Sequence, residues 1–194
     1  MDDRTRAFFR RTPLPCPVPY GTRIRLTGPL QGDPDPLPVG AEGTVVGGNG
    51  GQLWMKWDNG RTLFLLVDED PYEVIGTDVA EFVRLVREAV PELQALDVHR
   101  ASGGHVVVQL IRVHRDQRRN GAAERAMRLL TEWADFHGLV LSATASPVET
   151  ERPQTKVAPL KHWLARHGFR LNQGRKRNAV ISERYFRIPK GSQP

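Results

Sequence analysis

The chain has 194 residues, of which 39% are hydrophobic and 26% charged, and its formal net charge is +6. These values are typical of a soluble globular protein with one medium domain or two small ones. No apolar run approaches the ~20 residues that cross a bilayer, which excludes a membrane-spanning protein.

Cysteine use and the first residues bear on the compartment. The single cysteine, Cys16, excludes an internal disulfide and argues against a cysteine-based zinc site, so no metal site is predicted. Four arginines lie within the first eleven residues, but no apolar segment follows them, so the pattern is not that of a secretory signal. We therefore expect a cytoplasmic protein.

Charge is unevenly distributed along the chain. Residues 1–76 contain 8 Lys/Arg and 10 Asp/Glu, a net charge of −2, whereas residues 77–194 contain 20 and 12, a net charge of +8. A basic second half suits an anionic cofactor or a nucleic acid, although many basic surfaces only contact solvent.

Residues 1–20 form a basic and then proline-rich leader, for which we expect polyproline II or irregular chain. It is either an ordered strap over the next domain or a mobile arm. Residues 21–76 then contain short strand patterns separated by turn signals, at 22–27, 43–46, 52–57 and 61–67. Asn59-Gly60 predicts a tight turn, because both residues accept positive φ angles.

These patterns predict a small SH3-like β-barrel over residues 21–76. The span also resembles an uncharacterised domain family of that kind, through pieces such as Gly21-x-Arg23-x-Arg25-Leu26 and Trp57-Asp58-Asn59-Gly60. That resemblance implies no activity. The aromatic residues of the span form either its core or a binding patch; they are Trp54, Trp57 and Phe64.

Residues 77–194 read as an α/β domain with the order helix, strand, strand, loop, helix, strand, helix, strand. Thr77 or Asp78 is a candidate cap for a helix that ends before Pro91. Strands are expected at 96–101, 105–113, 139–145 and 180–187, and helices from about residue 121 to Gly138 and over residues 160–167. Residues 146–158 are expected to be a loop, and residues 174–178 a basic turn.

The stretch from Val113 to Ala123 is the first candidate site. An apolar strand leads into a basic turn, and small residues then begin a helix. A helix N-terminus with free N–H groups and arginines beside it suits a pyrophosphate. The alternative is a plain helix start, selected only for packing.

Arg118, Gly121 and Ala123 resemble the cofactor loop of the GCN5-related N-acetyltransferase (GNAT) superfamily, whose pattern is Gln/Arg-x-x-Gly-x-Gly/Ala. The resemblance implies acetyl-coenzyme A as cofactor and a mixed sheet with helices on both faces, in which two strands splay apart. It also implies which backbone groups hold the cofactor. Those of Leu110, Ile111, Arg112 and Val113 would bind pantetheine; those of Arg118, Arg119, Asn120, Gly121, Ala122 and Ala123 would bind the pyrophosphate.

Over residues 79–189 the chain is similar to a compact GNAT-like family of phage and bacterial genomes. The most specific shared piece is Asn172-x-Gly174-Arg175 followed by Ile181-Ser182-Glu183. The activity that this implies is direct transfer of an acetyl group to an amine of a small molecule or protein.

The resemblance leaves the proton donor open, because Leu164 stands where relatives carry a tyrosine that protonates the thiolate. Candidate substitutes are Tyr185, Ser142, His162 and His167. Glu183 is the candidate base or orienting carboxylate, or else forms a structural ion pair with Arg175 or Arg187. The strand before the loop offers only His105 and Gln109, and Arg175 and Ser182 are the expected substrate contacts.

Three functions therefore remain open from sequence. The first is an acetyl-coenzyme A-dependent N-acetyltransferase. The second is a nucleic-acid-modifying or nucleic-acid-binding protein, suggested by the basic second half and by Arg175 and Arg177. The third is a non-catalytic coenzyme-binding module, suggested by Leu164. Sequence does not indicate the oligomeric state.

Overall fold

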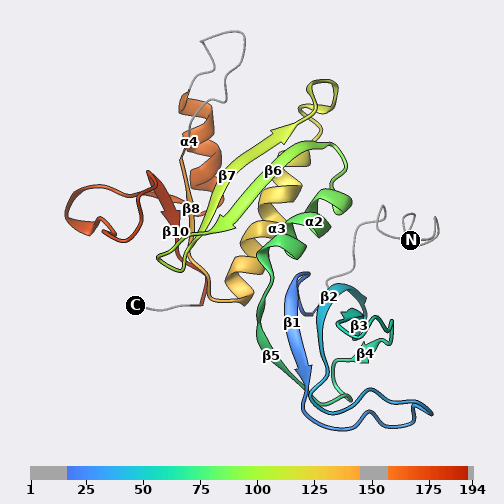
Figure 1. Ribbon diagram of the computed structural model, residues 1–194. Helices are drawn as coiled ribbons and strands as arrows, with labels where there is room; N and C mark the ends of the chain where they lie inside the picture. Colours follow the sequence, from blue (N-terminus) through green and yellow to red (C-terminus); the bar gives the residue numbers. More distant parts are fainter. Residues whose placement is uncertain (1–16, 145–156, 192–194) are drawn as a thin grey trace. The chain divides into compact units, whose positions relative to one another are not determined.

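A computed structural model describes residues 17–144 and 157–191. The chain divides into two compact units, Met1–Ala89 and Val90–Pro194, later than the boundary expected after residue 76. Figure 1 traces both units in chain order. The leader up to Cys16 and most of the loop expected at 146–158 lie outside the described residues. Among the described residues, no helix has both the length and the apolar character to span a membrane.

The first unit is built from one antiparallel sheet and one helix. Its elements are β1 (Thr22–Leu26), β2 (Glu42–Asn49), β3 (Gln52–Trp57), β4 (Leu65–Leu66), β5 (Tyr72–Thr77) and α2 (Val79–Ala89). The sheet order is β4-β3-β2-β1-β5. β3 lies where the alternating pattern predicts it, whereas the strand expected at 61–67 is reduced to two residues and β5 was not predicted.

The expected closed barrel is wrong, because this sheet is open. β4 pairs only with β3 and β5 only with β1, so among the described strands nothing joins the two edges. A strand as short as β4 offers too few backbone groups to close a barrel, which needs continuous pairing around the ring.

One face of the sheet carries the core of this unit, which includes Ile24, Val45 and Trp57. The three aromatic residues that were considered as one patch have different environments. Trp57 is buried and donates through Nε1 to the carbonyl of Leu63 at 2.8 Å, Trp54 is partly buried, and Phe64 is 55% exposed. Of these three aromatic residues, Trp57 alone is part of the core.

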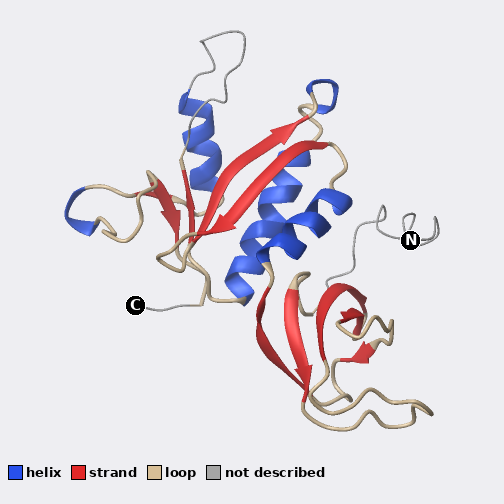
Figure 2. Cartoon of the chain, viewed as in Figure 1, coloured by secondary structure: helices blue, strands red, loops and turns tan. Residues whose placement is uncertain are grey.

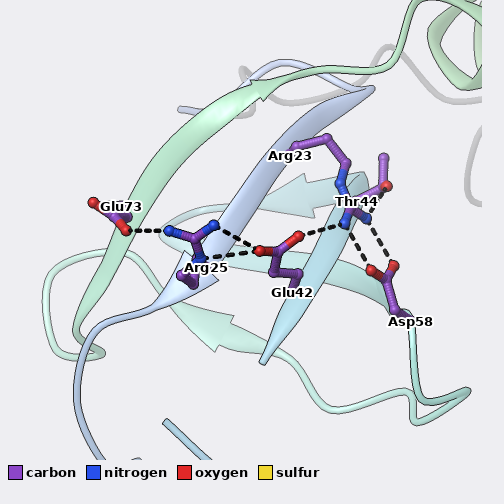
Figure 3. A network of polar contacts seen from close by, with 6 residues as sticks. All are labelled: Arg23, Arg25, Glu42, Thr44, Asp58 and Glu73. Carbon is purple, nitrogen blue, oxygen red and sulfur yellow. Dashed lines mark hydrogen bonds and ion pairs between the residues drawn. The ribbon is translucent and has the colours of Figure 1, made fainter. Parts of the chain in front are cut away.

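Opposite charges link three strands of the first unit and a turn (Figure 3). Arg23 binds both carboxylate oxygens of Asp58 at 2.7 Å, and Arg23 and Arg25 both bind Glu42. Hydrogen bonds from Arg25 and then Arg23 lower the pKa of Glu42 below its ordinary value. Arg25 also binds Glu73 of β5 at 3.2 Å, so the network holds β1 against β2, β5 and the turn.

Asp78 caps α2, as its position before the apolar helix pattern predicts. Its Oδ1 accepts a hydrogen bond from the backbone N–H of Glu81 at 3.1 Å, and its carbonyl accepts that of Phe82. The side-chain bond gives a partner to one of the N–H groups that the first turn of a helix leaves unpaired.

The second unit combines a mixed five-stranded sheet with two α-helices and two short 3₁₀ helices. Its elements are β6 (Leu93–Arg100), β7 (Val106–Val113), η1 (Arg115–Gln117), α3 (Ala122–Phe136), β8 (Leu141–Ala143), α4 (Val157–Arg166), β9 (Arg170–Leu171), η2 (Gly174–Lys176) and β10 (Tyr185–Arg187). The sheet order is β6-β7-β8-β10-β9; among the described strands β7 and β8 pair in parallel and the other neighbours are antiparallel. Figure 2 shows the two helices and the strands of this unit in contrasting colours.

α3 buries one apolar face along its length. Its buried face includes Met127, Leu130 and Trp133, and it packs along β7. The helix ends at Gly138, as predicted: Gly138 has φ +63°, and the N–H of Leu139 bonds to the carbonyl of Ala134 at 2.8 Å. This is the Schellman arrangement, which needs a left-handed residue after the helix.

The tail departs from the prediction. A continuous strand was expected over 180–187, with two alternating faces, but only Tyr185–Arg187 is a strand. The preceding residues form an irregular loop whose hydrogen bonds go to the side chain of Asn172 instead of to a neighbouring strand. The whole molecule is thus a mixed α+β protein with two sheets.

His137, at the end of α3, makes folding stability depend on pH. Burial, followed by the charge of Arg100, lowers the pKa of His137 from 6.5 to about 4. Between these two pH values the unfolded chain binds a proton at His137 and the folded chain does not. The free energy of unfolding therefore decreases as the pH falls from 6.5 towards 4. Allowing for partial exposure, we expect His137→Gln to remove about 1 kcal/mol of the stability lost between pH 7 and pH 5. Urea unfolding at both pH values measures this; the exposed His162→Gln is the control, and equal pH dependence in both variants would contradict the assignment.

Candidate functional site

β7 and β8 form a fork. They pair in parallel over three rungs, from Val106 opposite Leu141 to Val108 opposite Ala143, and β8 ends at Ala143. β7 continues for five more residues, paired only with β6 on its other side. The backbone groups of Leu110–Val113 that face away from β6 therefore form a free strand edge within the described part of the unit. An extended chain bearing amide groups can bind to such an edge as an added strand would.

A β-bulge sits at the branch of the fork. Opposite β6, Asp97 pairs with Leu110 and Val98 pairs with Val108, so Gln109 is an extra residue of β7. A bulge bends its strand and increases its twist. Because Gln109 directly follows the last rung with β8, the bend occurs where the two strands separate. The sequence signals this bulge only through Gln109 itself, a polar residue within an apolar run.

The loop from β7 to α3 has two residues in left-handed conformation. Arg119 has φ +71°, rare for a residue with a side chain, and Gly121 has φ +81°. Gly121 is the N-cap of α3 and no side chain caps this end, so the N–H groups of Ala122, Ala123 and Glu124 are free for a ligand. Arg118 folds back, with Nε 3.4 Å from the carbonyl of Val113.

Arg125 fixes the shape of this loop. Its Nη1 donates to the carbonyl of Asn120 at 3.0 Å, and its Nη2 binds Oε1 of Glu92 at 2.5 Å. The backbone of the same Glu92 accepts the N–H of His114 at 3.0 Å. Glu92, the residue before β6, thereby holds both ends of the loop. Sequence reasoning missed Glu92 and Arg125, which lie 33 positions apart and belong to no local motif.

A groove of about 630 Å³ begins at Gly121 and runs along α3 to the end of α4. Its volume is in the range of small-molecule sites. Glu124 joins its two walls: Oε2 accepts the Trp163 indole N–H at 2.8 Å, and Oε1 lies 3.1 Å from Nε2 of His167. Hydrogen bonds from Trp163 and His167, opposed by burial, lower the pKa of Glu124. Arg125 and Arg128 add positive charge along the groove.

Tyr185 lies in the row of residues at the branch of the fork. It pairs with Ala143, which pairs with Val108, and directly opposed residues share one face of a sheet. Tyr185 is 7% exposed, and no hydrogen bond of its hydroxyl to a described residue is present. Of the other candidate donors, His162 is exposed on α4 and His167 faces Glu124. Leu164, which has no proton to donate, is 3% exposed.

Glu183 is held by neighbours other than the arginines considered from sequence. Its Oε2 lies 3.2 Å from Nε2 of His105, and its Oε1 accepts the hydroxyl of Ser182 at 2.9 Å. Burial would raise the pKa of Glu183, but its own backbone N–H, Ser182 and the nearby Ser142 and His105 lower it. Glu183 is therefore an anion at neutral pH. Arg187 instead pairs with Asp135, so the ion pair proposed between Glu183 and Arg187 is wrong.

Two polar atoms beside this carboxylate are buried without a hydrogen bond to a described residue. They are Nδ1 of His105 and Oγ of Ser142. Buried polar atoms usually have partners, and exceptions often mark sites where a ligand or water binds. The predicted catalytic residues Glu183 and Ser142 are thus neighbours. Tyr185 is one rung from Ser142, so the two side chains point to opposite faces of the sheet.

The two residues predicted to contact the substrate lie in different places. Ser182 contacts Glu183, whereas Arg175 lies in η2 and is exposed. The described residues contain no group of three His, Cys, Asp or Glu side chains that could hold a metal ion.

Comparison with known families corrects the resemblance on which much of the site prediction rested. Residues 16–75 match the family described as Domain of unknown function (DUF4314). No acetyltransferase family is matched over residues 79–189, so the assignment to the GNAT superfamily is wrong. No curated protein and no solved structure matches the chain. A function for the second unit therefore has to be inferred from the geometry of that unit alone.

Proposed function

We propose that the second unit is an acetyl-coenzyme A-dependent N-acetyltransferase. The observation that carries the proposal is the fork between β7 and β8, with its bulge at Gln109, opening towards the uncapped start of α3. A free strand edge and a free helix start, joined by a basic loop, match a ligand with an amide-bearing arm and a pyrophosphate.

The residues present fit this cofactor. The carbonyls and N–H groups of Leu110–Val113 that face away from β6 would bind the two amides of pantetheine. The N–H groups of Ala122, Ala123 and Glu124 and the side chains of Arg118 and Arg119 supply donors and positive charge for the pyrophosphate. When bound, the cofactor supplies an acetyl group as a reactive thioester.

The chain's own residues then have two tasks. Glu183, an anion at neutral pH, would hold the amino group of the acceptor, next to the imidazole of His105. Tyr185, in the row at the branch of the fork and on the other face of the sheet from Ser142, would donate its hydroxyl proton to a leaving group held in the fork. Because the pKa of Glu183 is lowered, its role is to orient and stabilise a cation more than to remove a proton.

Tyr185→Phe tests the assignment of the acid. We expect kcat to fall about 100-fold with little change in the dissociation constant of acetyl-coenzyme A, because only the hydroxyl is removed. A thioester-cleavage assay with a panel of amines measures kcat, and calorimetry measures binding. Unchanged kcat in the variant would show that Tyr185 is not the acid.

Leu164 supports a second candidate, a coenzyme-binding module without turnover. Its side chain is buried on α4 and cannot donate a proton. The same assay separates the two functions: tight binding without cleavage of the thioester for any amine would favour the module.

A further inference from the structure

The loop between β9 and β10, residues 172–184, has a charge that acetyl transfer does not explain. β9 is the edge strand of its sheet, and Figure 1 shows the loop extending away from that edge. No element of the proposed coenzyme site lies in the tip of this loop. At its base, Glu183 contacts His105 of the proposed site.

Asn172 holds the base of the loop in one shape. Its Nδ2 donates to the carbonyls of Asn178 at 3.2 Å, Ile181 at 2.8 Å and Glu183 at 3.2 Å. Its Oδ1 accepts the N–H of Asn178 at 2.8 Å, and its own N–H bonds to the carbonyl of Arg184 at 2.8 Å. The side chain of Asn172 thus takes the place of the backbone hydrogen bonds of a hairpin. Because the loop is already ordered in the free protein, a ligand that binds to it loses less free energy to ordering the loop.

The loop and its flanks are basic with almost no internal neutralisation. Residues 170–190 contain seven Lys/Arg and a single acid, Glu183. That acid turns inward, to His105 and Ser182. Among the described residues, no carboxylate forms an ion pair with Arg175, Arg177 or Arg184, and all three are exposed.

A fourth arginine, Arg170, contacts an aromatic ring. Its guanidinium lies 4.5 Å from the centre of the Phe186 ring, which fixes it without neutralising its charge. Ordered, unpaired guanidinium groups lose little side-chain entropy on binding an anion and bind phosphate through two parallel hydrogen bonds.

The arrangement favours an extended polyanion over a small one. The groove along α3 does not include Arg175, Arg177 or Arg184, and a small phosphate ligand normally occupies a concave site. Residues 172–184 contain no aromatic side chain, so bases have no stacking platform here. We propose that residues 170–184 bind the phosphate backbone of a nucleic acid without sequence preference.

The test is fluorescence anisotropy of the full chain with a labelled DNA duplex and a labelled RNA hairpin. With four arginines on phosphates, the logarithm of the binding constant for duplex DNA should fall against that of the salt concentration with a slope of about −3 to −4. Arg175→Gln/Arg177→Gln should reduce this slope by about 2 and weaken binding at least ~10-fold at about 100 mM salt.

The matched control removes the same charge elsewhere. Arg87→Gln/Lys161→Gln changes two exposed residues on α2 and α4 and should leave binding within about twofold, which separates a site from a net-charge effect. Thermal melts establish that both double variants are folded. The proposal is overturned if neither nucleic acid binds at about 50 mM salt, or if both double variants lose the same affinity.

Discussion

Gly121→Glu is expected to weaken binding of acetyl-coenzyme A at least 100-fold. The new carboxylate would stand at the start of α3, where the pyrophosphate of the cofactor would bind. Two unit charges about 4 Å apart repel by ~4 kcal/mol at the effective dielectric constant near a protein surface, which is roughly a thousandfold in affinity. Space is not the obstacle, because a Cβ at this position meets only Nη1 of Arg125, at 3.7 Å.

Gly121→Gln is the matched control for that variant. Gly121 has φ +81°, so any side chain here strains the backbone, and glutamine does so to the same extent as glutamate. We expect Gln to reduce affinity less than about tenfold, leaving charge as the difference between the variants. Equal affinities of the two variants for acetyl-coenzyme A would show that the pyrophosphate does not bind at this helix start.

Asp135→Asn is expected to destabilise the second unit by about 3 kcal/mol, because it leaves a buried guanidinium without a counter-charge. Arg187 is 3% exposed and binds both oxygens of Asp135 at 2.6 Å. Oδ1 of Asp135 also accepts the backbone N–H of Lys190 at 2.7 Å. This one carboxylate therefore ties β10 and the chain after it to α3, and its loss should lower the melting temperature by about 10 °C or more.

Glu132→Gln provides the comparison on the same helix. Glu132 is exposed and its nearest cation, Arg128, lies 3.9 Å away, so its pair contributes at most about 0.5 kcal/mol. Calorimetric melting of the three proteins measures the difference. If Asp135→Asn melts within about 2 °C of Glu132→Gln, the buried pair does not hold this end of the unit.

Local patterns predicted those elements whose signals lie within one stretch of chain. Alternation gave the bounds of β3, Asp78 marked the start of α2, and Gly138 marked the end of α3. The strand, basic turn and helix around Gly121 were also readable, because a change from apolar run to three- and four-residue spacing is local.

The remaining features depend on contacts between distant residues. β5 has little apolar alternation and exists because it pairs with β1, some fifty positions earlier. The irregular tail depends on Asn172, whose side chain takes hydrogen bonds that the alternating pattern assigned to a strand. The bulge at Gln109 and the pairing of Glu183 with His105 likewise appear only once strand register is known. Periodicity carries no information on register between strands.

Calorimetric titration of the full chain with acetyl-coenzyme A, with a thermal melt alongside, tests the coenzyme site most directly. We predict one site with a micromolar dissociation constant, a melting temperature that rises with ligand concentration, and loss of both effects in Gly121→Glu. No heat of binding and no shift in melting temperature would mean that the start of α3 is an ordinary helix start and that the fork does not bind coenzyme.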